Sequence, residues 1–295
     1  MICDLCPRGC HTQRDETSRG YCGVGELPKI ARAALHFDEE PPISGSRGAG
    51  TIFFSGCNLR CVFCQNYAIS AENGGRIVTP YQLSEEYRRL EALGAQNIEF
   101  VTPSHYVHAI LKSLDYYHPR LPLIWNSSGY DKVETLRRLE GVIDIYLPDF
   151  KYSDNELAKR LSNCDDYVET ATAAIDEMLR QQPENVIEDG VMRRGVIIRH
   201  LVLPSHIKNS IGVLEIVKRN WSARKETSAL VSLMAQYMPA GRAADYPDIN
   251  RRLTKRESQK VLDRLYDLGL DGFAQELSSA DKKYVPEWDY GSDNR

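Results

Sequence analysis

The sequence has no uninterrupted apolar stretch of about 18 residues, the minimum that suggests a transmembrane helix. Its first ten residues, MICDLCPRGC, lack the charged leader and apolar run of a secretory signal. It also lacks an excess of basic residues, since the net charge is −4 and the isoelectric point about 6.0. The general attraction to nucleic-acid phosphates is therefore missing. We expect a cytoplasmic protein with no membrane partner and no nucleic-acid partner.

Cysteine is almost absent from most of the chain. Only Cys164 follows residue 64, and the other seven of the eight cysteines lie before that point. Disulfide frameworks are typical of short exported chains, whereas this chain is long and shows no export signal. We therefore expect the clustered cysteines to be reduced thiols that bind metal, and Cys164 to stand apart from them.

Short apolar runs alternate with helical patterns from about residue 50 to residue 240. The runs do not alternate cleanly with polar residues, which is typical of parallel strands buried on both faces. The expected strands are 50–56, 97–103, 121–129, 144–150, 195–204 and 229–239, and the expected helices are 80–94, 105–117, 131–139, one from 155 onward, and 209–219. This order predicts an α/β fold, namely a parallel (β/α)6 partial TIM barrel with a small cysteine-rich N-terminal segment.

Three parts of the chain follow from this pattern. We expect a cysteine-rich metal-binding segment over 1–48, the barrel over 49–240, and a C-terminal helix and tail over 241–295. Within them, turn signals over 183–195 predict a loop or small hairpin, and helical spacing that ends at a glycine predicts a helix over 254–272. The polar tail 278–295 is expected on the surface.

Three cysteines follow the first expected strand with the spacing C-x3-C-x2-C: Cys57, Cys61 and Cys64. Active groups in parallel folds come from the carboxyl ends of the strands and the loops after them. A 4Fe–4S cluster has four irons, so three cysteine ligands leave one iron open for a substrate. Gly56 can take backbone angles that other residues resist. A zinc site with a distant fourth ligand is the alternative.

Four more cysteines, Cys3, Cys6, Cys10 and Cys22, form a complete set of four thiolates near the amino terminus. The residues between them are polar and offer little core, so a bound metal would be needed to hold the segment. Zinc in a closed tetrahedral site and a second 4Fe–4S cluster both accept these ligands, with zinc slightly favoured. Thiols without any ligand are the third interpretation.

The segment from Cys57 to Cys64, with Phe63 just before the last cysteine, resembles the cluster loop of the radical S-adenosylmethionine (SAM) superfamily. Further motifs resemble its pyruvate formate-lyase activating enzyme-like branch and a subgroup with an N-terminal four-cysteine motif: DFK (149–151), WNSSGY (125–130), RHLVLP (199–204), LTKRE (253–257), CxLCPRxC, VTPSHY and MAQYMP. This resemblance implies a 4Fe–4S cluster whose open iron binds SAM. One electron then breaks the sulfonium to methionine and a 5′-deoxyadenosyl radical, which abstracts hydrogen from a substrate.

The resemblance also implies a set of SAM-binding residues: Phe63, Thr102, Pro103, Ser104, Asn126, Asp149, Lys151, Arg199 and Tyr237. Residues 102–104 stand where the family has a Gly-Gly-Glu-type loop. The replacement implies that the backbone contact with SAM is kept and the carboxylate contact is lost. Asn126 stands where related enzymes often carry an aspartate. Without the resemblance, Asp149 and Lys151 indicate a strand-end salt bridge, and Arg199 indicates a polar layer above the sheet.

Three functions follow as expectations. In the first, the radical removes hydrogen from a glycine Cα of a partner glycyl-radical enzyme. In the second, it modifies a small molecule or a peptide. The third, an iron–sulfur electron carrier, is disfavoured because electron transfer needs neither an open iron nor a β/α scaffold. The expected electron donor is a reducing partner such as flavodoxin or ferredoxin.

Overall fold

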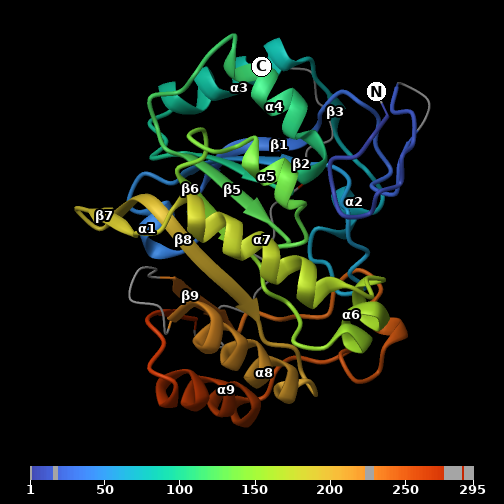
Figure 1. The fold of residues 1–295 in the computed structure, drawn as a ribbon, viewed down its shortest axis with the longest axis vertical. Coiled ribbons are helices and arrows are strands. Elements are labelled where there is room, and N and C mark those ends of the chain that lie inside the picture. Colours follow the sequence, from blue (N-terminus) through green and yellow to red (C-terminus); the bar gives the residue numbers. More distant parts are fainter. Residues whose placement is uncertain (1, 16–18, 223–228, 276–287, 289–295) are drawn as a thin grey trace.

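The computed structural model describes residues 2–15, 19–222, 229–275 and 288. In this part of the chain one sheet runs in the order β10-β9-β8-β6-β5-β4-β2-β1-β3, and β7 pairs with β8 (Figure 1). The strands are β1 (Lys29–His36), β2 (Ala49–Phe54), β3 (Arg76–Ile77), β4 (Ile98–Val101), β5 (Leu123–Ser127), β6 (Ile145–Pro148), β7 (Val186–Glu188), β8 (Val191–Leu201), β9 (Leu230–Met234) and β10 (Gly272–Ala274).

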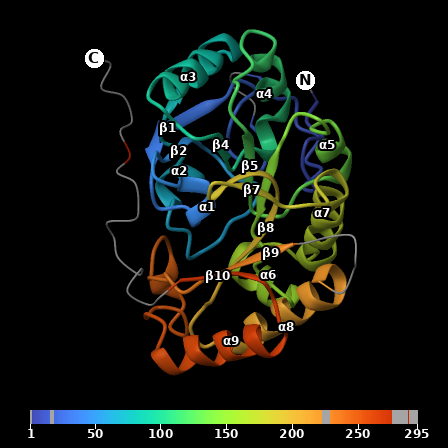
Figure 2. The same ribbon diagram turned by 90° about the vertical axis from the view of Figure 1, so that its left-hand side faces the viewer.

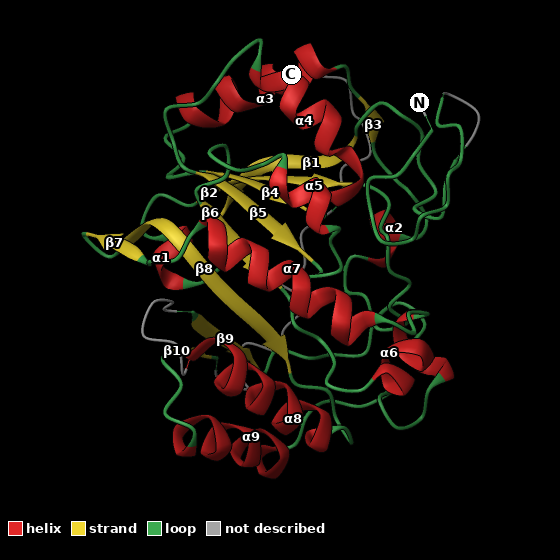
Figure 3. Cartoon of the chain, in the orientation of Figure 1, coloured by secondary structure: helices red, strands yellow, loops and turns green. Residues whose placement is uncertain are grey.

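Helices cover the outer side of this curved sheet (Figure 3). The α-helices are α1 (Pro41–Ser44), α2 (Tyr67–Ser70), α3 (Pro80–Ala92), α4 (Val107–Leu114), α5 (Val133–Arg137), α6 (Asn155–Ser162), α7 (Tyr167–Gln181), α8 (Ile207–Val217) and α9 (Lys255–Asp267). Shorter turns are η1 (Ser104–Tyr106), η2 (Lys218–Ser222) and η3 (Ala243–Asp245). Among the described residues, no helix combines the length and the apolarity needed to span a membrane.

The predicted parallel core is confirmed. Strands β2, β4, β5, β6, β8 and β9 are parallel neighbours in chain order, as successive β/α units require. Their side chains are almost all buried because the helices close one face and the barrel interior closes the other. The described strands end at β3 and β10 without meeting each other, so the barrel is partial.

Three strands were not predicted. The two-residue strand β3 pairs antiparallel with β1. Strand β1 lies in the segment expected to be cysteine-rich, yet it pairs antiparallel with β2 from Ile30 opposite Phe54 to His36 opposite Ala49. Strand β10 adds a parallel partner to β9. The helix expected over 254–272 is wrong at its carboxyl end. Helix α9 stops at Asp267, and the chain turns at Gly269, where φ is +58°, to enter β10.

The region 183–195 forms the predicted hairpin, in which β7 pairs with the start of β8. Asp189 and Gly190 make its turn at positive φ, which favours such two-residue connections. The helix predicted from residue 155 is two helices, α6 and α7. Asn163 ends α6 in the left-handed conformation, with φ at +52°.

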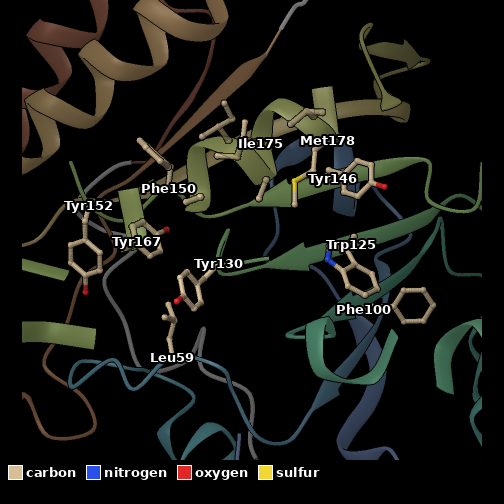
Figure 4. Close-up of a cluster of buried hydrophobic side chains, with 14 of the residues drawn as sticks. Leu59, Phe100, Trp125, Tyr130, Tyr146, Phe150, Tyr152, Tyr167, Ile175 and Met178 are labelled. Atoms are coloured by element: carbon tan, nitrogen blue, oxygen red, sulfur yellow. The ribbon is translucent and has the colours of Figure 1, made fainter. Parts of the chain in front are cut away.

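Aromatic side chains fill much of the core between the sheet and α7 (Figure 4). Trp125, Tyr146 and Phe150 come from the parallel strands or their ends, and each is fully buried. Burial of each such side chain stabilises the fold by about 2–3 kcal/mol. Leu59 of the cysteine loop belongs to the same cluster, so the loop is anchored in the core.

The described residues 2–15 and 19–28 form loops on the side of α5, with an isolated bridge between Ile2 and Gln13 (Figure 2). Leu5 is buried in the main core, and its carbonyl accepts a hydrogen bond of 2.9 Å from Thr135 Oγ1 of α5. Lys132 forms an ion pair with Asp4 across the same contact. The segment is therefore attached to the barrel through its own core residue.

Candidate active site

The cysteine loop begins directly after β2. Gly56 has φ of +82°, and a Cβ there would lie 2.8 Å from the carbonyl oxygen of Cys22. Its backbone N–H donates to Ile69 O at 2.9 Å, which ties the start of the loop to α2. The sequence-based expectation for Gly56 is confirmed. The same glycine also lets the N-terminal segment pack against the loop.

Cys57, Cys61 and Cys64 all line one cavity of about 240 Å³. Each sulfur accepts a hydrogen bond from a nearby residue: Cys57 from the Leu59 backbone at 3.3 Å, Cys61 from Ser162 Oγ at 2.9 Å, and Cys64 from Ser70 Oγ at 3.3 Å. Burial raises the pKa of Cys57 to about 12 and that of Cys64 to about 11, and neighbouring Cys61 adds to both. Thiols in this environment become thiolates when a metal replaces the proton.

This donor set fits a 4Fe–4S cluster. The sulfurs come from one short loop, face a shared cavity and carry the backbone and hydroxyl hydrogen bonds that tune cluster thiolates. Within the described ranges, no three Cys, His, Asp or Glu side chains are arranged so that they could hold one metal ion directly. In a four-iron cluster each cysteine binds a different iron, so its sulfurs are spread more widely than those around one zinc ion.

A chain of charges lines the cavity beyond the cysteines. Arg199 Nε donates to Asp149 Oδ1 at 3.1 Å, and Lys151 forms an ion pair with the same carboxylate. Burial opposes ionisation of Asp149, but Lys151 and Arg199 outweigh it and lower the pKa of the carboxyl. Burial likewise opposes the charge of Lys151, and Asp149 outweighs it and raises the pKa of the ammonium. All three groups are therefore charged at neutral pH.

Asp149 and Lys151 are held in place by Tyr167 of α7. The Lys151 backbone N–H donates to the Tyr167 hydroxyl at 2.9 Å, and that hydroxyl lies 2.9 Å from the carbonyl oxygens of Ser128 and Asp149. Asp149 forms a parallel bridge with Arg199 just beyond the end of β6. The pair thus sits at the carboxyl edge of the sheet, where parallel folds place reactive groups.

The network continues inward through Asn126 and Glu99. Arg199 Nη2 donates to Asn126 Oδ1 at 2.6 Å, Asn126 Nδ2 donates to Glu99 Oε1 at 2.6 Å, and Thr51 Oγ1 donates to Glu99 Oε2 at 2.8 Å. Burial raises the pKa of Glu99. Sequence reasoning missed Glu99, although a carboxylate inside the apolar strand IEFV was a usable signal.

Glu39 was also missed. It precedes α1, far from the motifs in sequence, yet its Oε2 lies 3.1 Å from Arg199 Nη1. Burial and the neighbouring Glu99 raise the pKa of Glu39 well above its ordinary value, against the opposing effect of Arg199. Other lining residues outside the predicted set are His36, Asp38, Glu40, Phe53, Phe54, Leu59, Gln65, Asn66, Ile69, Ser70, Val101, Ser127, Ser128, Leu201, Met234, Gln236 and Gln275.

The structure brings six of the nine predicted SAM-binding residues to the cavity wall. These are Phe63, Thr102, Asn126, Asp149, Lys151 and Arg199. Thr102 has φ of +59°, an unfavourable conformation for threonine, and its N–H donates to Asn126 O at 2.9 Å. Such local strain is typical of functional loops.

Pro103, Ser104 and Tyr237 lie outside the cavity lining. The side chain of Ser104 is hydrogen-bonded to Asp131, and Pro103 precedes the η1 turn and turns away with it. Tyr237 is buried, its hydroxyl donates to Ile249 O at 2.7 Å, and its ring lies 6.2 Å from that of Phe63. Tyr237 lies beyond the end of β9, which stops at Met234. Its ring therefore packs against Phe63 and does not line the cavity.

The four N-terminal cysteines have a different setting. Cys3, Cys6 and Cys22 are buried and Cys10 is exposed, and none of them lines the cavity. Burial raises the pKa of Cys6 to about 12, and the nearby thiols of Cys22, Cys3 and Cys10 contribute in the same direction. Arg14 Nη1 lies 3.7 Å from Cys3 Sγ.

Residues 51–192 match the Radical SAM superfamily. The chain is similar to the uncharacterized protein MJ0674 of Methanocaldococcus jannaschii, with 35% identity over 278 residues that cover 91% of this chain and 75% of that protein. It is similar in fold to a spore photoproduct lyase variant, with a TM-score of 0.52, 11% identity, and coverage of 83% of this chain and 80% of the lyase. SuiB of Streptococcus suis bound to S-adenosylmethionine has a TM-score of 0.51 and 10% identity over 79% of this chain. The chain spans about half of SuiB, since 51% of that protein is covered.

Proposed function

We propose that this chain, whose residues 51–192 match the Radical SAM superfamily, is an enzyme that cleaves SAM reductively and abstracts hydrogen from a substrate. One observation carries this proposal. The three cysteines of a single loop line the same cavity as the Asp149, Lys151 and Arg199 network. A metal-binding triad beside a polar, charged wall is what binding of a charged cofactor at an open iron would require.

Cys57, Cys61 and Cys64 would hold the cluster. When bound and reduced, a 4Fe–4S cluster supplies the electron that breaks the sulfonium bond of SAM. The hydroxyls of Ser70 and Ser162 donate to two of the sulfurs and hold their orientation.

The charged wall would bind the rest of SAM. Lys151 offers an ammonium donor to a carboxylate, and Asp149 offers acceptor oxygens to hydroxyl groups. Asn126 has both of its amide atoms engaged, one with Arg199 and one with Glu99, so it positions Arg199 and takes no ligand of its own.

Apolar residues complete the wall and exclude water. Phe53, Leu59, Phe63 and Val101 line the same cavity as the cysteines. A reactive radical needs such shielding, because exclusion of water prevents side reactions.

The test is SAM cleavage by anaerobically reconstituted protein with dithionite as the reductant, measured as 5′-deoxyadenosine formed. We expect formation by the natural chain and at least about a tenfold higher KM for SAM in Lys151→Met, since a buried charged hydrogen bond is lost. The exposed Lys112→Met, 59% exposed at its side chain, is the matched control and should behave like the natural chain. No 5′-deoxyadenosine from protein that contains iron and sulfide would overturn the proposal.

The substrate class is a finer proposal. The motifs around Cys57 and Asp149 support the pyruvate formate-lyase activating enzyme-like branch, in which the target is a glycine Cα of a partner glycyl-radical enzyme. A small molecule or a peptide is the alternative. Appearance of a protein-based glycyl radical after incubation with a candidate partner would support the first class. Flavodoxin or ferredoxin is the proposed physiological reductant.

We also propose that Cys3, Cys6, Cys10 and Cys22 bind either zinc or a second iron–sulfur cluster. Three buried thiols and one exposed thiol near one another support this proposal. In the described part of the chain no three of them are placed to hold one ion directly, so metal binding would draw these loops together. Iron, acid-labile sulfide and zinc per chain decide between the two. About four irons with one zinc would mean a structural zinc site, and about eight irons without zinc would mean a second cluster.

A further inference from the structure

The cavity extends from one edge of the barrel to the other. The cysteine loop follows the carboxyl end of β2, whereas His36, at the end of antiparallel β1, pairs with Ala49 at the amino end of β2. The six residues of β2 separate these edges by about 17 Å. Residues from both edges line the cavity. Its inner end is formed by the segment 36–40, and Glu39 of this segment reaches Arg199, which in turn binds Asp149 near the cysteine loop.

This inner end is acidic. Among the described lining residues, the segment 36–40 contributes three carboxylates (Asp38, Glu39 and Glu40), and Arg199 is the permanent cation that reaches them. Lys151 is paired with Asp149, and Arg199 is shared between Asp149 and Glu39. His36 lies 3.8 Å from Glu39, and burial lowers its pKa, so it adds little positive charge at neutral pH. The wall thus has more acceptors than its own donors satisfy.

Glu40 is the clearest case. It is 6% exposed, and its Oε2 atom is buried without a hydrogen-bond partner. A second lining atom, Gln275 Oε1, is also buried without a partner. Both atoms are acceptors, and a buried carboxylate oxygen without a donor is costly. A ligand that supplies N–H donors and positive charge would complement the site.

We propose that the inner end of the cavity is a substrate subsite for an ammonium or guanidinium group, with Glu40 as its acceptor and Glu39 beside it. The inference rests on the proposed function only in taking the ligand to be the substrate. The amino group of SAM would bind at the cluster held by Cys57, Cys61 and Cys64, whereas Glu40 comes from the segment after β1 and is not one of the residues assigned to SAM. A directly held divalent ion does not fit, since no three suitable side chains in the described chain converge on one position.

This subsite bears on the substrate class. A glycine Cα carries no cationic side chain, whereas amines and basic peptides do. The acidic inner end therefore favours a small molecule or peptide with a basic group over a bare glycyl loop.

The experiment measures binding of small probes to the reconstituted full chain by NMR titration, without SAM or reductant. The probes are n-butylammonium, n-butylguanidinium and, as neutral and anionic comparisons, butan-1-ol and pentanoate. We expect at least one of the two cations to bind about tenfold or more tightly than butan-1-ol, because charge-assisted hydrogen bonds in a buried site discriminate by about that much. Glu40→Gln should remove this preference, and the exposed Glu134→Gln should keep it.

The outcomes separate this subsite from the proposed chemistry. If neither cation binds better than butan-1-ol to the natural chain, the subsite is refuted whatever Glu40→Gln does to folding. A cation preference that survives in a folded Glu40→Gln protein refutes the role of Glu40. Cation binding through Glu40 in a protein that fails to cleave SAM would uphold the subsite and overturn only the radical chemistry.

Discussion

The two cysteine sets of this chain have opposite settings. Cys57, Cys61 and Cys64 follow a buried parallel strand and line a cavity with Asp149, Lys151 and Arg199. The N-terminal set, Cys3, Cys6, Cys10 and Cys22, lies in loops, and none of its members reaches that cavity. Three ligands on a rigid edge leave room for a substrate, whereas four ligands in a loop segment saturate a metal.

The proposed roles of the two sets differ accordingly. The first set lines the cavity that would admit a reactant, and a metal at the second set would hold its segment against the barrel. The two sets nevertheless touch, because Gly56 of the cysteine loop packs on the carbonyl of Cys22. A metal in the N-terminal set would therefore stabilise the start of the catalytic loop.

The largest expected effect comes from removing one cysteine of the first set. Cys61→Ala should reduce iron at this site from about four atoms per chain to nearly none, because two thiolates hold a 4Fe–4S cluster poorly. Formation of 5′-deoxyadenosine should cease, and far-ultraviolet circular dichroism should stay unchanged. Cys164→Ala is the matched control, since Cys164 is buried outside both sets, and it should keep its iron. If Cys61→Ala kept all of its iron, the first set would not be the ligands of a cluster, and this distinction from the N-terminal set would be lost.

A stability effect is expected from the second set. Cys22→Ala should lower the free energy of unfolding by about 4 kcal/mol or more, because loss of a structural metal is among the largest single-residue effects, and should release the second metal. Denaturant unfolding under anaerobic conditions measures this, with metal analysis of the same samples. Iron at the cavity should largely remain. If Cys22→Ala instead abolished SAM cleavage without a loss of stability, the N-terminal set would have to act in the chemistry.

The sequence was sufficient for the barrel and for its reactive edge. Six apolar runs without polar alternation predicted the six parallel strands, because burial on both faces leaves that pattern. Strand β1 escaped prediction because KIARAALH mixes charged and small residues, as an antiparallel strand near the sheet edge can. Strand β10 is only three residues long, and its pairing with β9 depends on distant contacts.

Site residues that belong to a recognisable sequence motif could be predicted. Site residues that only strand pairing brings into the cavity could not. Asp149 and Arg199 were identified by motif, and the structure places both at the cavity. Glu39 and Glu40 carry no motif, and only the pairing of β1 with β2 brings them to the inner end. Tyr237 was expected at a strand end, but β9 stops at Met234 and leaves its ring behind Phe63.

A pH experiment sharpens the comparison, because the buried charge network surrounds only the first set. Burial and Glu99 raise the pKa of Glu39 above its ordinary value of 4.5, so the folded chain binds this proton more tightly than the unfolded chain does. The ionised carboxylate therefore lowers stability as pH rises above about 4.5. Glu39→Gln mimics the protonated form, and its stability relative to the natural chain should be higher at pH 8 than at pH 5. Urea unfolding at both values measures this, and a difference that does not grow with pH would contradict it.

The smallest expected effect concerns the hydrogen bonds to the cavity sulfurs. Ser70→Ala removes the donor 3.3 Å from Cys64 Sγ while the cysteine stays in place. Hydrogen bonds to cluster sulfurs favour the more negative, reduced state, so the midpoint potential should fall by on the order of tens of millivolts. Anaerobic titration followed by electron paramagnetic resonance measures the shift, and the exposed Ser46→Ala serves as control. An unchanged potential would mean that Ser70 orients the loop without tuning the cluster. The first set of cysteines would then differ from the N-terminal set only in its access to the cavity.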